Sequence, residues 1–406
     1  MKHGIFSTLV LALAVSACAS GGAFAEPRQL AASPITGVST GTNFSFDLGI
    51  VVGNRYYLSD KSNAAIDVFD TATSVQVGQI KGSGPNAFAG NVKTNGKADI
   101  PRSGPNGINA VGSLLYVGDV NSVKIIDPAA KKIIKTIVVG ASGTRADEGC
   151  VDAVHGLYMI SSPEADTPFA TVINTATQAV VAQVTFTDSK GKPSGGLEQC
   201  RYDPGSDTFY VNNDGTTDNP HGELVAMPGA SIRSITPGAT VNYTTLAGMR
   251  EFGLGDCDPT GLALGPNTDV AVGCRPETAG APLLVLIMNR TTGNIVASVN
   301  AGGGDQIEYD VSTNRYYSAA SRWNASGKAN DHGACSAASP CTPVLAIIDA
   351  GTRTLVTQLP SGNNAHSVSV DAVTGKVFMP ASSGVSPPGC STCSNEPARL
   401  LTFAAK

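Results

Sequence analysis

Short apolar segments recur along this chain, and many of them alternate apolar with polar positions. Each recurring unit has an alternating segment, a tight turn rich in Gly, Asp or Asn, and a second segment with Tyr, Phe or Val, which is the pattern of an antiparallel hairpin. Seven units are present, and the residues that open their first strands are Phe46, Asn106, Glu148, Glu198, Thr260, Asp305 and His366. This repetition predicts one repeat architecture for the whole chain.

A third apolar strand follows each hairpin, and most units continue through a turn into a fourth strand. The seventh unit has no fourth strand, because the chain ends at Lys406. A ring of sheets has no free edge only when every position is filled, so we expect residues 29–35 to supply the missing outer strand. The predicted fold is all-β: a seven-bladed β-propeller of four-stranded antiparallel blades, closed by an N-terminal strand.

The second unit carries a family resemblance. Residues 104–140, with Gly-Pro-Asn-Gly-Ile, Leu-Leu-Tyr-Val and Lys-Ile-Ile-Lys-Thr-Ile-Val-Val-Gly, resemble the YVTN-type propeller repeat of prokaryotic surface and periplasmic proteins, and residues 366–378 are similar to it. The resemblance covers most of the chain and implies the propeller fold. Propellers of this kind serve as binding platforms, lactonases, lyases and electron-transfer subunits, so the fold does not select a function.

The first 25 residues have the pattern of a secretory signal: Lys2, an apolar run over residues 5–15, and Ala-Phe-Ala before Glu26. We therefore expect residues 1–25 to be a signal peptide, residues 26–406 to form a single propeller domain, and the protein to be periplasmic or secreted. An alternative is a lipoprotein, because Val-Ser-Ala-Cys18 resembles a lipoprotein cleavage box. Lipidation of Cys18 would be the one route to the membrane.

The composition limits the kinds of partner that the protein can bind. The formal net charge is −5, with 46 Gly, 24 Pro and only 15% charged residues. Removal of Lys2 with the signal would make the net charge more negative still, which argues against nucleic acid as a partner. Many turn formers and few charges fit a turn-rich, exported all-β protein.

Eight cysteines lie outside the signal, and an even number in an oxidising compartment predicts disulfides. Cys257 and Cys274 lie at adjacent ends of two antiparallel strands, so we expect them to pair. Two further pairs would close small loops, and the remaining pair follows by elimination. In order, these are Cys335 with Cys341, Cys390 with Cys393, and Cys150 with Cys200.

The seven residues that open the inner strands should form a ring around the central channel. This ring brings together three carboxylates, an amide and an imidazole, with Asp47 and Asp258 beside it. Like charges in a narrow channel raise one another's pKa unless a cation, a proton or water relieves them. We therefore expect a divalent metal cation (Ca²⁺, Mg²⁺, Mn²⁺, Zn²⁺ or Fe²⁺) held by Glu148, Glu198, Asp305 and His366. The alternative is a water-filled polar plug.

The long connections should all lie on one face, where the inner strands begin, because the turns within hairpins and before fourth strands are short. Ligand sites are often carried on such loops, so the ring should lie at the bottom of a funnel. We expect Asn106, Arg275, Arg322 and Trp323 to contact a ligand there, with salt bridges and loop packing as the alternative roles of the last three. His221 and His332 fall in the same loops, whereas His155 lies in a hairpin turn on the opposite face and is predicted to be a surface residue.

These observations favour an exported propeller that binds a small molecule or a protein at its funnel face, with a cation at the channel mouth. The rival hypothesis is a metal-dependent hydrolase, lactonase or lyase. In that case the cation would polarise a carbonyl, and the catalytic residues would be His366, Glu148 and Glu198, with Asp305 a further proton carrier. A third hypothesis is a scaffold subunit without a small-molecule site.

Overall fold

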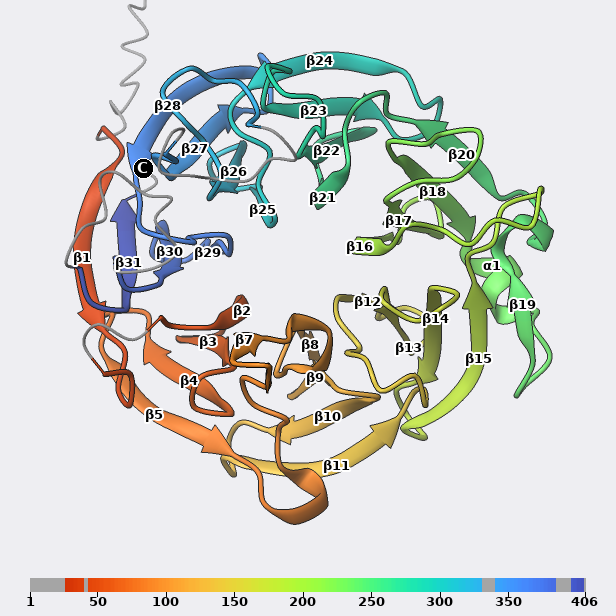
Figure 1. The fold of residues 1–406 in the computed structure, drawn as a ribbon, viewed down its shortest axis with the longest axis horizontal. Helices are drawn as coiled ribbons and strands as arrows, with labels where there is room; N and C mark the ends of the chain where they lie inside the picture. The colour runs from red at the N-terminus through yellow and green to blue at the C-terminus, as the bar shows by residue number, and fades with distance from the viewer. Residues whose placement is uncertain (1–25, 40–42, 331–339, 385–395, 405–406) are drawn as a thin grey trace, which may run out of the picture.

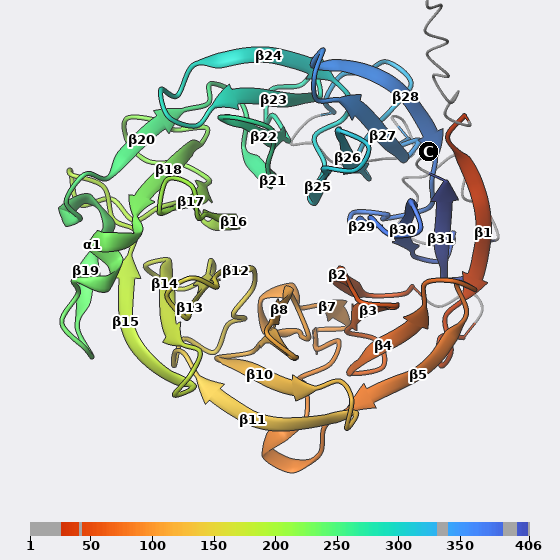
Figure 2. The same ribbon diagram turned by 180° about the vertical axis from the view of Figure 1, so that it is seen from behind.

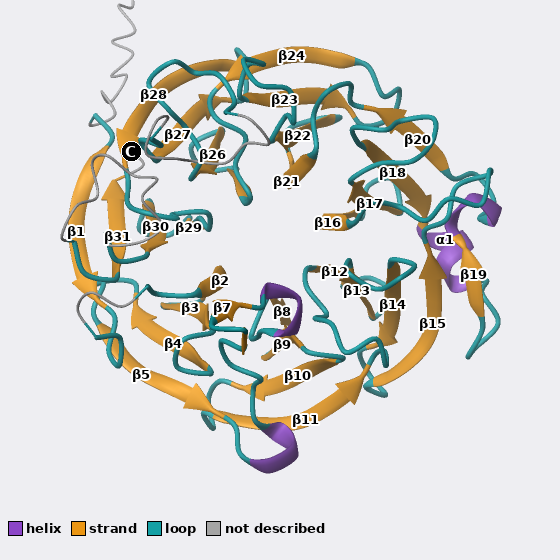
Figure 3. Cartoon of the chain, in the orientation of Figure 1, coloured by secondary structure: helices purple, strands orange, loops and turns teal. Residues whose placement is uncertain are grey.

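Seven sheets of antiparallel strands are arranged in a ring around a central channel (Figure 1). The computed structural model describes residues 26–39, 43–330, 340–384 and 396–404. Within these residues, helix is limited to α1 (Gly229–Arg233) and three 3₁₀ turns, which are η1 (Gly84–Asn86), η2 (Ile100–Arg102) and η3 (Tyr243–Thr245) (Figure 3). The prediction of an all-β, seven-bladed propeller is confirmed.

Each blade runs from an inner strand beside the channel to an outer strand at the rim, as both faces of the ring show (Figures 1 and 2). The first two blades contain β2 (Phe46–Val52), β3 (Arg55–Asp60), β4 (Ala65–Asp70) and β5 (Gln76–Lys81), then β8 (Ile108–Val111), β9 (Leu114–Asp119), β10 (Ser122–Asp127) and β11 (Lys132–Val138). The third and fourth contain β12 (Gly149–Asp152), β13 (Leu157–Ser162), β14 (Phe169–Asn174) and β15 (Ala179–Thr185), then β16 (Leu197–Asp203), β17 (Thr208–Asn213), β18 (Glu223–Pro228) and β20 (Arg250–Gly253). The fifth and sixth contain β21 (Pro259–Leu264), β22 (Asp269–Cys274), β23 (Leu284–Asn289) and β24 (Ile295–Asn300), then β25 (Ile307–Asp310), β26 (Arg315–Ala320), β27 (Val344–Asp349) and β28 (Thr354–Pro360). The seventh contains β29 (Ser369–Asp371), β30 (Lys376–Ala381), β31 (Arg399–Ala404) and β1 (Arg28–Pro34).

Aspartates that end inner strands close the hairpin turns. Asp152 Oδ1 accepts from the N–H groups of Val154 and His155, each at 3.0 Å. Asp310 and Asp371 make the same kind of contact with residues two positions ahead. A carboxylate that binds main-chain donors two residues on stabilises the turn directly, which explains why short Asp-rich segments separate the first and second strands.

The ring is closed by β1, which pairs antiparallel with β31 as the outer strand of the seventh blade. Ala32 lies opposite Leu401, and Arg28 lies opposite Ala404. The first and last strands of the chain therefore share one sheet, as predicted from the missing fourth strand.

Close packing behind the channel depends on glycine at the inner strands. A Cβ at Gly149 would lie 2.4 Å from the Tyr158 hydroxyl, and a Cβ at Gly49 would lie 2.1 Å from that of Tyr56. Both tyrosines are fully buried. Such distances are too short for any side chain, so these two glycines make room for the aromatic residues of the second strands.

The long connections lie mainly on the face where the inner strands begin, as predicted. They include the segment after β5 with the small hairpin of β6 (Lys93–Thr94) and β7 (Lys97–Ala98). One expectation is wrong: the connection before the fourth strand of blade four is long. It holds α1, β19 (Thr240–Asn242) and η3, and β19 adds a parallel fifth strand to blade three beside β15. The outer edge of blade three offers free main-chain groups that this insertion pairs.

The two disulfides predicted between well-separated residues are confirmed, Cys150 with Cys200 and Cys257 with Cys274. Cys341 is also disulfide-bonded. Cys335, Cys390 and Cys393 lie outside the described residues, as do the signal segment and Cys18. Disulfides indicate an oxidising location outside the cytoplasm. Among the residues that the structure describes, no helix has the length and apolar character needed to cross a bilayer.

Candidate functional site

The main-chain pairing of the inner strands shows which residues are equivalent around the channel. Ser161, the fifth residue of β13, donates its N–H to the Glu148 carbonyl at 3.0 Å. Ala319, the fifth residue of β26, donates in the same way to Gln306 at 3.1 Å. Glu148 is therefore equivalent to Gln306, and it is the preceding residue, Asp147, that is equivalent to Asp305.

The first blade shows the same one-residue difference from the predicted ring. Gly49 pairs with the fourth residue of β3, and Gly149 pairs with the fourth residue of β13. Asp47, rather than Phe46, is thus equivalent to Asp147. Adjacent residues of a strand point to opposite sides, so the shift changes which side chains belong together. The ring at the start of the inner strands, here called the mouth ring, consists of Asp47, Asn106, Asp147, Glu198, Thr260, Asp305 and His366.

Phe46, which sequence alignment of the repeats placed in the ring, is instead a core residue. It is 3% exposed and packs against Phe44 and Tyr56 in a cluster of apolar side chains. The His366 imidazole stacks on the Phe46 ring with centroids 4.5 Å apart and an interplanar angle of 10°. The His366 Nδ1 atom lies 2.7 Å from the carbonyl oxygen of Asn364.

Arg145 is the centre of the charge network at the channel mouth. Its guanidinium lies 2.8 Å from Asp147, 2.9 Å from Glu164 and 3.7 Å from Asp47. Lys61 adds a second cation, 2.5 Å from the same Asp47 carboxylate. Because each of these groups is largely buried, each charge is stable only while its oppositely charged partners are present.

A second group of cations lies across the mouth. The Arg275 Nε atom is 2.9 Å from Asp258. Burial acts to lower the pKa of Arg275, but the charges of Asp305, Glu198 and Asp258 outweigh burial and raise it. Burial, and then repulsion from the nearby Arg275 guanidinium, lowers the pKa of Arg322. Guanidinium groups of the protein itself thus offset part of the repulsion that we expected a metal to relieve.

Even so, the carboxylates at the mouth exceed the cations. Burial raises the pKa of Asp147 to about 7, and burial followed by the charge of Asp258 raises that of Asp214 to about 7. Burial and then Asp214 raise the pKa of Glu198 well above its usual value. Among the residues that the structure describes, the Oδ1 atoms of Asp147 and Asp214 and the Oε2 atom of Glu164 are buried without a hydrogen-bond partner. The site is therefore short of positive charge and of donors.

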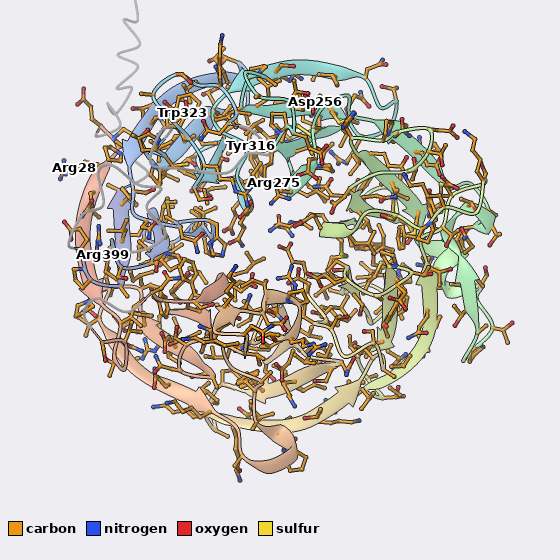
Figure 4. The ribbon with its side chains drawn as sticks, in the orientation of Figure 1. Arg28, Asp256, Arg275, Tyr316, Trp323 and Arg399 are labelled. Carbon is orange, nitrogen blue, oxygen red and sulfur yellow. A yellow bond between two sulfur atoms is a disulfide. The ribbon has the colours of Figure 1, made fainter. Side chains whose placement is uncertain are left out.

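The predicted ligand contacts differ in their surroundings. Asn106 is fully buried, and its amide donates to the Ala146 carbonyl at 3.1 Å. The Trp323 indole packs on Gly302, where an added Cβ would lie 3.1 Å from a ring carbon. Figure 4 shows Arg275 nearer to the central channel than Trp323. Arg275 and Arg322 are thus the two predicted contacts that belong to the charge network of the mouth.

The four predicted metal ligands are Glu148, Glu198, Asp305 and His366. Their charges influence one another, since Glu198 raises the pKa of Glu148 and Asp305 raises that of Glu198, in each case after burial. In the part of the chain that the structure describes, however, their ligand atoms do not form a group of three within 4.8 Å. Their roles as metal ligands and catalysts stay predictions.

Asp152, His155 and Asp207 do form such a group, on the opposite face, and could hold a metal ion. The His155 Nδ1 atom is 2.8 Å from Asp152 Oδ2. Arg233, however, already donates to both oxygens of Asp207, at 2.8 and 2.7 Å, and lies 3.2 Å from His155 Nδ1. A guanidinium thus supplies the positive charge here. His155 is at the surface as predicted, with a side chain 35% exposed.

Sequence reasoning missed Arg145, Asp147, Glu164 and Asp214. The first two lie in the segment before β12, and alignment of the repeats on their second strands would have placed Asp147 in the ring. Glu164 and Asp214 follow second strands, at the same end of the blade as Arg275 and Arg322. Their positions in the repeat could therefore have predicted that they lie at the channel mouth. Of the two loop histidines, His221 lies 3.7 Å from Glu277, and His332 is outside the described residues.

Comparison with known proteins supports the fold alone. No protein-family model matches the chain, and no curated protein matches its sequence. The structure is similar to Kuenenia stuttgartiensis hydrazine synthase, with a TM-score of 0.58 and 13% identity over 85% of this chain and 95% of that one. It is also similar to a chain of a mitotic checkpoint complex, with a TM-score of 0.57 and 11% identity over 98% of this chain and 99% of that one. The seven-bladed propeller fold is therefore shown, whereas membership of the YVTN-type family stays a prediction.

Proposed function

We propose that this protein is an exported propeller that binds a small molecule or protein at the funnel face, with a cation held at the channel mouth. The observation that carries the proposal is the set of buried, unpartnered carboxylate oxygens of Asp147, Glu164 and Asp214. A buried carboxylate oxygen without a donor is costly. A bound cation would remove that cost. The disulfides support an exported location.

The balance of charge at the mouth points the same way. Within the described ranges, seven carboxylates gather there against four cationic side chains, with His366 beside them. The carboxylates are Asp47, Asp147, Glu164, Glu198, Asp214, Asp258 and Asp305, and the cations are Lys61, Arg145, Arg275 and Arg322. Raised pKa values mean that the excess is relieved by protons when no cation is bound. A cation would displace those protons, and oxygen ligands suit Ca²⁺, Mg²⁺ or Mn²⁺ best.

Metal-assisted hydrolysis or elimination is the second candidate function. Asp147 and Asp214 have pKa values of about 7, which is where a general acid or base works best at neutral pH. Arg275 beside them could hold an anionic substrate. This candidate requires the same cation site, so the binding experiment comes first.

The test is thermal unfolding of the chelator-treated protein with Ca²⁺, Mg²⁺, Mn²⁺ or Zn²⁺. A cation that binds only the folded state raises the melting temperature, and the rise grows with the logarithm of its concentration above Kd. We expect Glu198→Gln and Asp214→Asn, which remove charge with little change of shape, to abolish the shift. Glu251→Gln on the outer strand β20 is the matched control and should retain it.

The pH dependence gives a second readout. Protons compete with the cation for Asp147 and Asp214, so the shift should be larger at pH 8 than at pH 6. A protein that contains no metal and shows no shift with any of the four cations would overturn the cation site. The funnel would then be a polar plug held together by Arg145 and Arg275.

A further inference from the structure

A cavity of about 400 Å³ lies in the central channel, and residues from the inner strands of all seven blades line it. Figure 1 shows these strands converging on the centre of the ring. Its charged groups are Glu148, Arg201 and Glu308, and apolar side chains such as Leu48, Ile108 and Leu264 make up much of the rest. No residue of the mouth ring is among those that line this cavity. Glu148 lies one residue beyond the ring residue Asp147 along its strand.

Polar side chains on the inner strands usually bind the neighbouring blade. Gln199 Oε1 accepts from the Leu262 N–H at 2.8 Å, and Gln306 Oε1 accepts from the Val368 N–H at 2.9 Å. Glu308 Oε2 accepts from the Val370 N–H at 3.0 Å. These side-chain contacts join neighbouring blades alongside a few main-chain hydrogen bonds, such as that from the Gln306 N–H to the His366 carbonyl at 3.1 Å.

Glu148 departs from this pattern. It is equivalent to Gln306, which binds its neighbouring blade, yet the Glu148 Oε2 atom has no hydrogen-bond partner in the described part of the chain. The residue is 6% exposed and lines the cavity. A buried, unpartnered carboxylate oxygen facing a cavity is costly to the free protein. A ligand group that donates hydrogen bonds to this carboxylate would remove that cost.

Arg201 is the complementary group. Its Nη1 atom donates to the Cys200 carbonyl at 2.9 Å, and its Nη2 contacts with Gln199 and Ile307 are long, at 3.4 and 3.5 Å. No carboxylate oxygen of the described residues lies within 4.0 Å of its nitrogens, although Glu148 and Glu308 both act on it electrostatically. Five N–H donors are present on a guanidinium. Arg201 therefore keeps donors for an anionic ligand group.

We propose that this cavity binds a small zwitterion, a molecule with an ammonium group and a carboxylate, as in a free amino acid. The ammonium lies between Glu148 and Glu308, and the carboxylate lies on the Arg201 guanidinium, where a planar fork binds two oxygens. The apolar lining covers the hydrocarbon part. A cavity of this size falls within the usual range for small-molecule sites. The proposal goes beyond the cation site at the mouth and does not depend on it.

Isothermal titration calorimetry of the whole purified protein tests this assignment. The probes are L-leucine and 4-aminobutyrate, which carry both charges at different spacing, and n-butylamine and butyrate, which carry one each. We expect a zwitterion to bind at a single site, and each singly charged probe to bind at least about tenfold more weakly, because one buried charged group is then left unpaired. If n-butylamine binds as tightly as the best zwitterion, or if neither zwitterion binds, the proposal is wrong.

Variants locate the site. Glu148→Gln should weaken zwitterion binding, and Arg201→Met should weaken it by at least about tenfold. Arg201→Lys keeps the positive charge but lacks the planar pair of donors, and it replaces the Met variant if that variant does not fold. We expect it to weaken zwitterion binding by a smaller factor. Glu251→Gln on the rim is the control and should bind as the unchanged protein does. Binding that survives both Glu148→Gln and the folded Arg201 variants would overturn the assignment, whatever happens to the mouth cation site.

Discussion

Gln199 and Glu148 occupy equivalent places in neighbouring inner strands, but only Gln199 reaches the next blade, with its Oε1 2.8 Å from the Leu262 nitrogen. Among the described residues, Glu148 Oε2 is buried without a hydrogen-bond partner. The oxygen of Gln199 joins two blades, whereas the equivalent Glu148 lines the cavity and keeps an acceptor for a ligand.

Glu148→Gln should stabilise the protein at high pH. Burial, and then the charge of Asp147, raises the pKa of Glu148 well above the usual 4.5. A raised folded-state pKa means that stability is lost as pH rises from about 4.5 through the folded value. Glutamine stays neutral, so the variant should be more stable than the unchanged protein at pH 8 and equally stable near pH 4. Urea unfolding at both pH values measures the difference, and equal stability at pH 8 would contradict it.

Arg145→Gln should destabilise the protein far more than Arg55→Gln. Arg145 neutralises Asp147 and Glu164 in a buried site, and its loss should cost about 3–5 kcal/mol. Arg55 pairs with Asp70 at 2.6 Å, but its side chain is 33% exposed, so its loss should cost less than about 1 kcal/mol. The cost of Arg145→Gln should be smaller at pH 5, where Asp147 is protonated. Chemical denaturation of both variants gives the comparison.

The two described disulfides should contribute different amounts of stability. Cys257 and Cys274 are 17 residues apart, and Cys150 and Cys200 are 50 apart. Loop-closure entropy predicts losses of about 3 and about 4 kcal/mol when each pair is replaced by alanine. Equilibrium unfolding in urea should rank the two variants in that order. Peptide mapping without reductant provides the control that both bonds form in the unchanged protein.

Deleting residues 26–35 should open the ring. The deletion removes β1 and so exposes the edge of β31. It also removes Ile35, which is 4% exposed, and uncovers the apolar side chains that pack around it. A free strand edge invites association between chains, so we expect a lower melting temperature and oligomers in light scattering. Leu30→Ser, at a position that is 45% exposed, is the control and should remain as stable as the unchanged protein. A monomeric, equally stable deletion variant would show that closure by β1 is dispensable.

The blade number, the strand order within each blade and the closing strand could all be read from the repeat itself. Local signals carry this information, because alternating apolar positions, Asp-rich turns and an incomplete last unit each act within a few residues. The Cys257–Cys274 bond was predictable for the same reason, since it joins two adjacent strand ends.

The composition of the mouth ring was only partly predictable. Sequence similarity between the repeats placed Phe46 and Glu148 in the ring, one residue away from Asp47 and Asp147. Short strands can be aligned by sequence with an error of one residue, whereas main-chain pairing defines which residues are equivalent. Tertiary structure alone decided how Arg145 meets Glu164 and Asp47, since Glu164 lies in another loop and Asp47 in another blade.

The sequence by itself determined that seven hairpin units must close into a ring with acidic residues at one end of the channel. Tertiary structure decided which acids are neutralised by arginine and which remain without a partner. The physical reason is range: hydrogen-bonded turns and strand patterns act between near neighbours in the chain, whereas the charge state of Asp147, Glu148 or Glu198 depends on burial and on groups from other blades.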